Sequence, residues 1–192
     1  FSKIKANLTS KKFIVKYSEV TVKNHKYFLP LDSLHNDDSY NFLMGNYYEP
    51  ETHDSIKKLI MKKPGNIIHA GTSFGDMIPS FSQIIGNEYI LYAFEPNLDN
   101  YILSKKTIEE NHINNTILFN VALSSKIGVS KLQTIDYKNI PLGGRSIICE
   151  NGNKIINTLK IDNLDIDNLS CIHLDIEGHE LLALKGAENT IK

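Results

Sequence analysis

Between residues 66 and 184, short apolar runs of strand length alternate with segments of helical periodicity, and turns containing glycine or asparagine separate them. The expected strands cover 66–70, 88–94, 116–120 and 171–176. Helices are expected over 76–85 and 97–111, where apolar residues recur at helical spacing. Because strands that alternate with helices form covered parallel sheets, the pattern predicts an α/β fold, a mostly parallel sheet with helices on both faces.

The flanking segments follow other patterns. Apolar and polar residues alternate over 13–22 with Ser18-Glu19 between two apolar groups, which predicts an N-terminal β-hairpin or a pair of short strands. We expect loop with short helical turns over 30–50, a helix over 52–63 and a β-rich stretch over 128–161. The chain therefore divides into an N-terminal β-hairpin and cap segment, 1–50, and an α/β domain, 51–192.

The charge balance excludes one class of function. The 21 Lys and Arg residues face 22 Asp and Glu residues, and the net charge of −1 lacks the basic excess of a general nucleic-acid binder. No apolar run approaches the ~20 residues of a membrane span. Since there is also no signal-peptide pattern, we expect a cytoplasmic protein.

Ligands of such sheets bind at the carboxyl ends of the strands, so the polar residues there are the candidate site. Glycines in the turn from Gly71 to Gly75 let the backbone approach a ligand and leave helix amides free. Glu95 ends the second strand, where a carboxylate can accept hydrogen bonds from both hydroxyls of a ribose. Together they predict an adenosine ligand. Because Ser73 replaces the second glycine of G-x-G-x-x-G, the turn argues against an NAD-dependent oxidoreductase.

Two further strand ends point to the same crevice. The small and apolar residues at 121–123 are suited to flank an adenine ring, although a buried strand end explains them equally well. In the last strand, alternation puts His173, Asp175 and Glu177 on one side. A parallel strand has little reason to carry three polar side chains unless they reach a site.

These strand ends carry four motifs in a fixed order. They are Gly71-x-x-x-Gly75, Tyr92-Ala93-Phe94-Glu95-Pro96-Asn97, Asn120-Val121-Ala122-Leu123-Ser124 and Asp175-Ile176-Glu177-Gly178-His179-Glu180, followed by Leu184-Lys185-Gly186-Ala187. Their order and spacing resemble the FkbM family of S-adenosylmethionine-dependent methyltransferases. The resemblance covers about 45–192. It implies a Rossmann-like methyltransferase domain over 51–192 that transfers methyl groups to oxygen, often on sugars of glycans and natural products.

The resemblance also implies the residues that hold S-adenosylmethionine. The glycine turn would surround the methionine part, Glu95 would hold the ribose and Val121-Ala122 would border the adenine. Asp175 would face the methionine amine or the reacting hydroxyl, and Tyr47 and Glu49 belong to a segment similar to the family's entry motif. The complete set of expected cofactor contacts is Tyr47, Glu49, His69, Gly71, Thr72, Ser73, Gly75, Glu95, Pro96, Asn97, Val121, Ala122 and Asp175.

The sequence departs from the family pattern at three points. His69 replaces the acid common at the end of the first strand, and His173 replaces the lysine usual two places before Asp175. The chain also stops at Lys192, where the family adds further strands, so we expect a domain that is incomplete or shortened at its C-terminal end.

A sugar hydroxyl is a poor nucleophile and benefits from a general base. The candidate catalytic residues are Asp175, His173 and His179. The rival scheme is a divalent ion, Mg²⁺ for oxygen ligands, held by Asp175, Glu177 and His179. Arg145, in a loop with two glycines, is a candidate contact for an anionic acceptor.

The leading interpretation is an O-methyltransferase that acts on a hydroxyl of a small molecule or glycan. One alternative is a degenerate cofactor-binding module of a larger multidomain glycan-modifying enzyme, which His69 favours. The other is the NAD-dependent oxidoreductase.

Overall fold

The computed structural model describes residues 3–10 and 13–192. Its first element is a three-stranded antiparallel sheet in the order β1-β2-β3. The strands are β1 (Lys3–Ser10), β2 (Phe13–Val22) and β3 (His25–Pro30). The expected N-terminal hairpin is present, but its turn was expected in the wrong place. Ser18 is buried within β2 and pairs with Leu29, whereas Lys23 and Asn24 make the turn with positive φ angles.

The cap segment continues with short helical elements, as expected. They are the 3-10 turn η1 (Leu31–Ser33) and helix α1 (Asp37–Leu43). Helix α2 (Pro50–Lys62) follows, with a proline in its first turn and Ile56 and Ile60 on its buried face.

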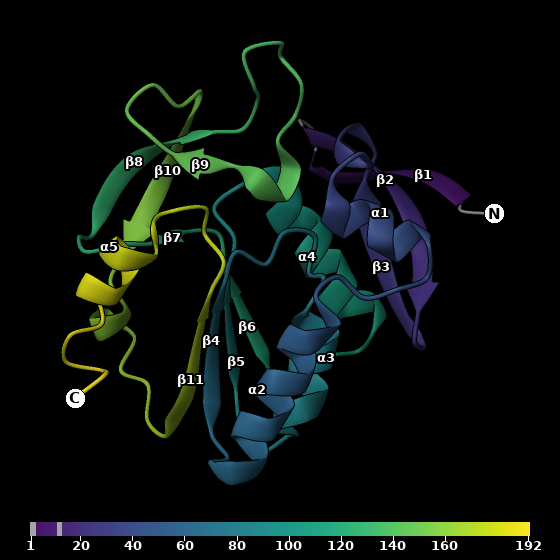
Figure 1. Cartoon of the computed structure of the whole chain (residues 1–192). Helices are drawn as coiled ribbons and strands as arrows, with labels where there is room; N and C mark the ends of the chain where they lie inside the picture. Colours follow the sequence, from purple (N-terminus) through teal and green to yellow (C-terminus); the bar gives the residue numbers. More distant parts are fainter. Residues whose placement is uncertain (1–2, 11–12) are drawn as a thin grey trace.

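The central sheet has four parallel strands in the order β11-β4-β5-β6 (Figure 1). The strands are β4 (Asn66–Ala70), β5 (Leu91–Phe94), β6 (Thr116–Phe119) and β11 (Leu169–Leu174). Helix α3 (Ile78–Ile85) joins β4 to β5, and α4 (Leu98–Glu110) joins β5 to β6. Asn97 caps α4 as expected, because its side chain accepts a hydrogen bond from the amide of Asp99 at 3.2 Å.

Helices cover both faces of the central sheet. On one face, α2 and α3 bury Ile67, Leu91 and Ala93, and α4 packs beside them. On the other, Ile68, Ala70 and Phe94 contact α5 (Glu180–Lys185), its following Ala187 and the 3-10 turn η3 (Ile161–Asn163). The expected α/β Rossmann-like fold is therefore confirmed.

A second four-stranded sheet stands above the carboxyl ends of the central strands (Figure 1). Its order is β7-β10-β8-β9, and only the β7–β10 pair is parallel. The strands are β7 (Ala122–Leu123), β8 (Gly128–Gln133), β9 (Ile147–Ile148) and β10 (Lys154–Leu159). A β-rich stretch over 128–161 was expected, and the 3-10 turn η2 (Gly143–Arg145) interrupts it.

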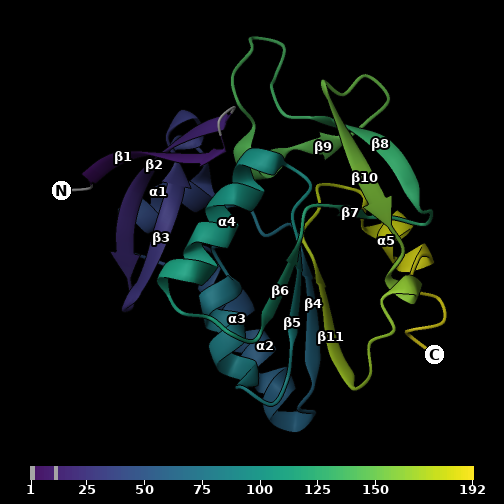
Figure 2. The ribbon, with the colours of Figure 1, turned by 180° about the vertical axis from the view of Figure 1, so that it is seen from behind.

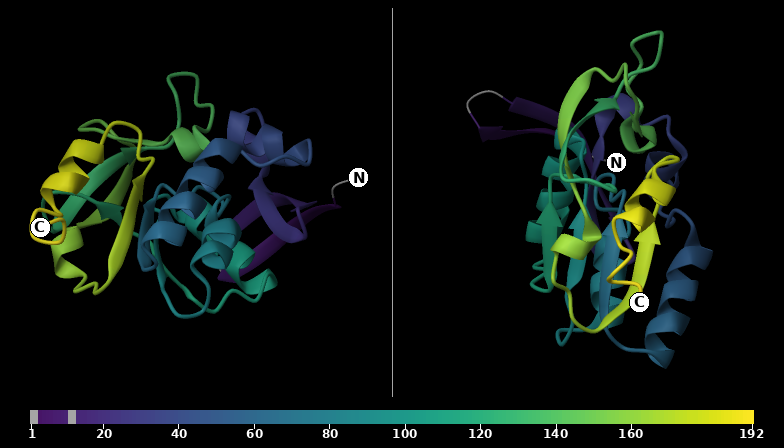
Figure 3. Two further views of the ribbon diagram at one scale, coloured as in Figure 1. Left: turned by 60° about the horizontal axis from the view of Figure 1, so that its bottom comes forward. Right: turned by 90° about the vertical axis from the view of Figure 1, so that its left-hand side faces the viewer.

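The N-terminal sheet packs on α4 (Figure 2). Leu103 of α4 lies in one apolar cluster with Tyr27 and Phe28 of β3 and with Phe74 of the glycine turn. Figure 3 shows the N-terminal sheet and the second sheet on opposite sides of the molecule, with the central sheet between them. No helix within residues 3–10 and 13–192 is long and apolar enough to cross a membrane.

Candidate functional site

The carboxyl ends of β4, β5 and β11 meet where the strand order reverses, because β5 follows on one side of β4 and β11 lies on the other. Gly71 is at the centre of this edge. Its amide donates to the carbonyl of Phe94 at 3.0 Å, and the amide of Asp175 donates to the carbonyl of Ala70 at 3.0 Å. Gly71 has a φ of +85°, and a Cβ there would lie 1.8 Å from the backbone oxygen of Asp175. Only glycine therefore fits between these strand ends.

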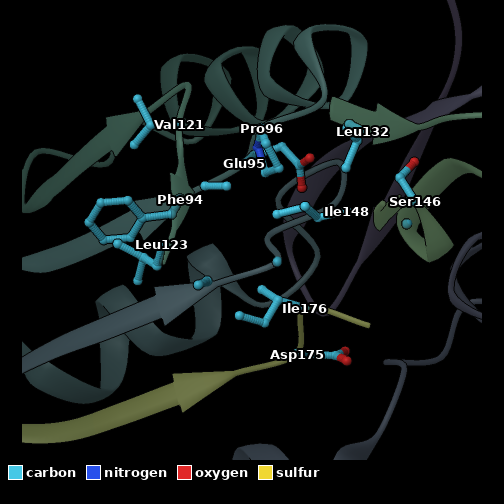
Figure 4. Close-up of a pocket in the computed structure, with 14 residues that line it drawn as sticks. Phe94, Glu95, Pro96, Val121, Leu123, Leu132, Ser146, Ile148, Asp175 and Ile176 are labelled. Carbon is cyan, nitrogen blue, oxygen red and sulfur yellow. The ribbon is translucent and has the colours of Figure 1, made fainter. Parts of the chain in front are cut away.

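A first cavity opens at this edge, and we call it the apolar cavity because most of its walls are apolar. Its lining consists of Ala70, Gly71, Phe94, Glu95, Pro96, Val121, Ala122, Leu123, Leu132, Gly144, Ser146, Ile148, Asp175 and Ile176. Figure 4 shows Val121, Phe94 and Leu123 together on one side of the view and the carboxylates of Glu95 and Asp175 on the other. The cavity thus combines an apolar wall with two carboxyl groups, which follow the strands on either side of β4.

Glu95 is held in place by the backbone. Its two carboxylate oxygens accept hydrogen bonds from the amides of Ser73 at 2.9 Å and Asn97 at 2.8 Å, and the residue is 5% exposed. Burial raises the pKa of Glu95 to about 8, against the effect of the two amides, which favour the charged form. When Glu95 is charged, each oxygen keeps a further lone pair for a ligand, so the carboxylate can still accept two hydrogen bonds.

A second cavity adjoins the first, and we call it the acidic cavity. Its lining consists of Asn36, Asp37, Asp38, Tyr48, Gly71, Ser73, Asp76, Gly144, Arg145, Asp175 and Glu177. Gly71, Gly144 and Asp175 line both cavities. Asp175 therefore stands at the junction between an apolar chamber and a chamber with several carboxylates.

Burial raises the pKa of three carboxyl groups that line the acidic cavity. The pKa of Asp175 is raised to about 6, first by burial and then by Glu49 and Glu177. The pKa of Asp76 is raised well above its usual value by burial and then by Asp38. Burial also raises the pKa of Asp38, although the hydroxyl of Ser73 donates to it at 3.1 Å. The cavity is therefore suited to a cationic group, which would favour the charged carboxylates.

Two loops far apart in the sequence close over the junction. A guanidinium nitrogen of Arg145 donates to Oδ1 of Asn36 at 2.6 Å, and the amide nitrogen of Asn36 donates to the carbonyl of Leu142 at 2.7 Å. Gly144 packs against Ser73 and Asp38 so closely that a Cβ would lie 2.9 Å from Oδ2 of Asp38. Together with Leu132 and Ile148 of the second sheet, this contact forms the wall opposite the central strands.

The structure brings seven of the thirteen expected cofactor contacts to the walls of the two cavities. Gly71, Glu95, Pro96, Val121, Ala122 and Asp175 line the apolar cavity. Ser73 lines the acidic cavity. These positions follow from the strand ends, which the hydrophobic pattern located.

His69 and His173 lie away from both cavities. They are opposite each other in the parallel β4–β11 pair, and their Nδ1 atoms are 3.0 Å apart. Both rings contact Phe81 of α3, with centroid separations of 5.2 and 5.6 Å. Burial lowers the pKa of each imidazole, so the pair is neutral and one ring donates to the other.

The expected entry residues face another surface. The ring of Tyr47 stacks on His53 at 4.6 Å and lines a separate groove with Lys23. Glu49 begins α2 with a φ of +46° and accepts a hydrogen bond from the hydroxyl of Thr52 at 3.0 Å. Its charge raises the pKa of Asp175, so it influences the junction without lining it.

Three further residues expected to contact the cofactor instead support the backbone around the glycine turn. The hydroxyl of Thr72 is buried against that of Ser104 at 3.2 Å, and Gly75 packs on the backbone of Ser104. The backbone amide of Asn97 donates a hydrogen bond to Glu95, and the side chain of Asn97 caps α4. They hold the site's backbone without lining either cavity.

Of the three candidate catalytic residues, only Asp175 lines the cavities. Asp175 reaches the junction, whereas Nε2 of His179 is 3.1 Å from the hydroxyl of Ser124 and lines neither cavity. The three residues expected to hold a metal ion are not brought together, because Asp175 and Glu177 line the acidic cavity whereas His179 contacts Ser124. Within the part of the chain that the structure describes, no group of three or more His, Cys, Asp or Glu side chains is arranged to hold a metal ion.

Several residues that line the two cavities were not predicted from the sequence. Leu132, Ser146 and Ile148 come from the second sheet, whose approach to the central sheet no local pattern reveals. Asp38 lies in the cap segment, which gave few regular signals. Asp76 did carry a signal, since it is an acidic residue directly after the second glycine of the turn.

Comparisons with known proteins bear on this geometry. The methyltransferase FkbM domain matches residues 69–192, about two thirds of the chain. A structure of an S-adenosylmethionine-dependent methyltransferase from Aquifex aeolicus is similar over 46% of this chain, with 14% identity and a TM-score of 0.32. A structure of Trm5b from Pyrococcus abyssi is similar over 61% of this chain, with 12% identity and a TM-score of 0.33.

The matched region of this chain spans 54% of the Aquifex protein and 34% of Trm5b. No curated protein has a sequence that matches it significantly.

Proposed function

The chain belongs to the FkbM family of S-adenosylmethionine-dependent methyltransferases, and we propose that it is an O-methyltransferase that methylates a hydroxyl of a sugar or glycan. The observation that carries this proposal is the apolar cavity, where three parallel strand ends surround a chamber with the buried carboxylate of Glu95 at its polar side. A cytoplasmic setting and a glycan or small-molecule acceptor belong to the same proposal.

The residues of the apolar cavity fit the adenosine half of S-adenosylmethionine. Phe94, Val121 and Leu123 offer apolar surface to an adenine ring. Glu95 lines the cavity, and its charged form can accept one further hydrogen bond at each oxygen, the number that the two ribose hydroxyls require. Since Gly71 has no side chain, the ligand's tail can pass over the turn from this cavity to the acidic one.

The junction of the cavities suits the transfer itself. When bound, S-adenosylmethionine supplies an electrophilic methyl group for in-line transfer to an oxygen. Asp175 is the residue we assign as general base, because it lines both cavities and can accept the proton of an acceptor hydroxyl. With its pKa raised to about 6, Asp175 is charged at neutral pH and a stronger base than an ordinary aspartate.

The rim of the acidic cavity would receive the acceptor. Among the described residues, Arg145 is the one cation that lines it, and its contact with Asn36 leaves other N–H donors free for acceptor oxygens. Glu177 is exposed on the same rim and can accept hydrogen bonds from sugar hydroxyls. Closure of the two loops over the junction would exclude water from the transferred methyl group.

Calorimetric binding of S-adenosylhomocysteine, with NAD as the control ligand, tests the cofactor assignment. We expect micromolar binding of S-adenosylhomocysteine, no binding of NAD, and a large loss of affinity in Glu95→Ala. The matched variant Glu88→Ala removes an exposed carboxylate far from the cavity and should bind as the wild type does. Binding of NAD alone, or equal binding by the two variants, would contradict the assignment.

Transfer of a labelled methyl group to a panel of free sugars, sugar phosphates and oligosaccharides tests the acceptor. The proposal expects an O-methylated product and loss of transfer in Asp175→Asn with cofactor affinity kept. Methylation at nitrogen or carbon would contradict it. Cofactor binding without transfer to any acceptor would favour the cofactor-binding module.

A further inference from the structure

The site lacks a carboxylate where β4 ends. His69 occupies that position, and its ring is buried against Phe81 and hydrogen-bonded to His173, so it faces away from both cavities. The methionine part of S-adenosylmethionine carries an ammonium group, and a buried ammonium requires charged or hydrogen-bonding partners. Those partners have to come from another part of the site.

Asp76 is the buried carboxyl group that faces the acidic cavity. It lines that cavity and is 6% exposed. Its Oδ1 accepts a hydrogen bond from the amide of Met77 at 2.8 Å, and no described residue donates to its Oδ2. A carboxyl group with one free oxygen, buried at the edge of a cavity, has unused capacity to accept hydrogen bonds.

The described residues around Asp76 are mainly acidic, and none of them is a cation paired with it. The groups that act on it are the carboxyls of Asp38, Asp175 and Glu95. Arg145 lines the same cavity, but it donates to Asn36 and acts on Asp38. Burial of an unpaired carboxylate among other carboxylates is unfavourable, so a cationic ligand would relieve it.

We propose that Asp76 binds the methionine ammonium group of S-adenosylmethionine and thereby replaces the carboxylate that the end of β4 lacks. The inference rests on the proposed function. An ammonium group fits better than a metal ion, because the described carboxylates form no metal-binding group. Asp38, held by the hydroxyl of Ser73, lines the same cavity and offers a second acceptor for the ammonium protons.

The assignment predicts that binding releases a proton. The titratable and charged groups around Asp76 are Asp38 of α1, Asp175 after β11, Glu95 after β5, Arg145 of η2 and the buried hydroxyl of Tyr27 in β3. Because burial and these acids favour the protonated form of Asp76, an arriving ammonium group has to displace its proton. Affinity for a ligand with this ammonium group should therefore fall as the pH is lowered.

Calorimetry with two adenosine ligands tests the proposal. S-adenosylhomocysteine carries the ammonium group, whereas 5′-methylthioadenosine lacks the whole amino-acid part. In Asp76→Asn we expect the affinity for S-adenosylhomocysteine to fall about 10- to 100-fold, the range of a charge-assisted hydrogen bond, and that for 5′-methylthioadenosine to stay unchanged. The affinity of Asp76→Asn for S-adenosylhomocysteine should also depend less on pH than that of the wild type. Asp54→Asn makes the same chemical change at an exposed site outside both cavities and should alter neither affinity.

Other results overturn the inference. An equal loss for both ligands would mean that Asp76 acts through the fold, and no loss for either would mean that it does not touch the ammonium group. Thermal unfolding checks that Asp76→Asn is folded, and if it is not, Asp38→Asn provides the second variant, with a smaller loss expected only for S-adenosylhomocysteine. If the wild type binds neither ligand, the proposed function itself fails and this inference with it.

Discussion

Gly71 offers the sharpest test of how the strand ends build the site. A Cβ at this position would lie 1.8 Å from the backbone oxygen of Asp175 and 2.8 Å from its carbonyl carbon. Contacts of Cβ atoms below 3.0 Å are essentially never seen, so Gly71→Ala has to separate the two strand ends by about 1.2 Å. That movement strains the 3.0 Å hydrogen bond from the amide of Asp175 to Ala70.

The magnitude follows from a comparison with Gly45, which has nearly the same φ angle. The φ angles are +85° at Gly71 and +81° at Gly45, but a Cβ at Gly45 would meet nothing within 4 Å. Gly45→Ala therefore carries only the left-handed cost of about 1–2 kcal/mol, offset by about 0.4–1 kcal/mol of lost unfolded-state entropy. Gly71→Ala adds about 1–3 kcal/mol for the buried backbone groups whose hydrogen bond is broken.

Urea unfolding of both variants and of the wild type measures this difference, and calorimetry with S-adenosylhomocysteine measures its effect on the site. We expect Gly71→Ala to be less stable than Gly45→Ala by about 1–3 kcal/mol. We also expect it to bind at least tenfold more weakly, since a 1 Å misplacement in a site can cost about 100-fold in rate. Equal unfolding free energies for the two variants would refute the reasoning, because the clash would then cost nothing.

Three other predictions concern the supports of the site. Because burial lowers the pKa of His69 and His173, the unfolded chain takes up protons first at these two sites, and their contribution to the free energy of unfolding should decrease as the pH falls below about 6.5. The buried carboxyl groups contribute with the opposite sign, so the test is the difference between the wild type and His69→Leu, and a difference that stays constant between pH 7 and 5 would contradict this. His69→Leu leaves His173 without its hydrogen bond and should cost about 1–3 kcal/mol in urea unfolding, whereas His69→Asn can restore the bond and should cost less. Ser104→Ala removes the hydroxyl that donates to the carbonyl of Ser73 at 2.7 Å and should lower stability by about 1–3 kcal/mol, while the exposed Ser55→Ala should have little effect.

The central sheet and its glycine turn could be predicted because their signals are local. Short apolar runs, glycine and asparagine breaks and a capping residue identify β4, β5 and α4 within a few residues. Their parallel arrangement then brings Gly71, Glu95 and Asp175 to one edge. No knowledge of long-range contacts is needed for that step, since the carboxyl ends of parallel strands meet at the same side of the sheet.

The walls of the site could not be predicted, because they depend on contacts between distant segments. Arg145 and Asn36 are 109 positions apart, and their hydrogen bond closes one side of the acidic cavity. The hairpin turn was missed for a different reason. Ser18 looked like a turn residue, but β3 and α4 bury it in the core, whereas the real turn at Lys23-Asn24 carries no glycine.

His69 and His173 show how pairing register changes the meaning of two sequence departures. In the sequence they are 104 positions apart and look like two separate losses, an acid and a lysine. The parallel register of β4 and β11 makes them direct neighbours, and the 3.0 Å contact between their Nδ1 atoms makes them one neutral, hydrogen-bonded pair. Asp76, seven positions after His69, is a buried carboxyl group that lines the acidic cavity, and we propose that it accepts the ammonium group in place of the carboxylate missing from the end of β4.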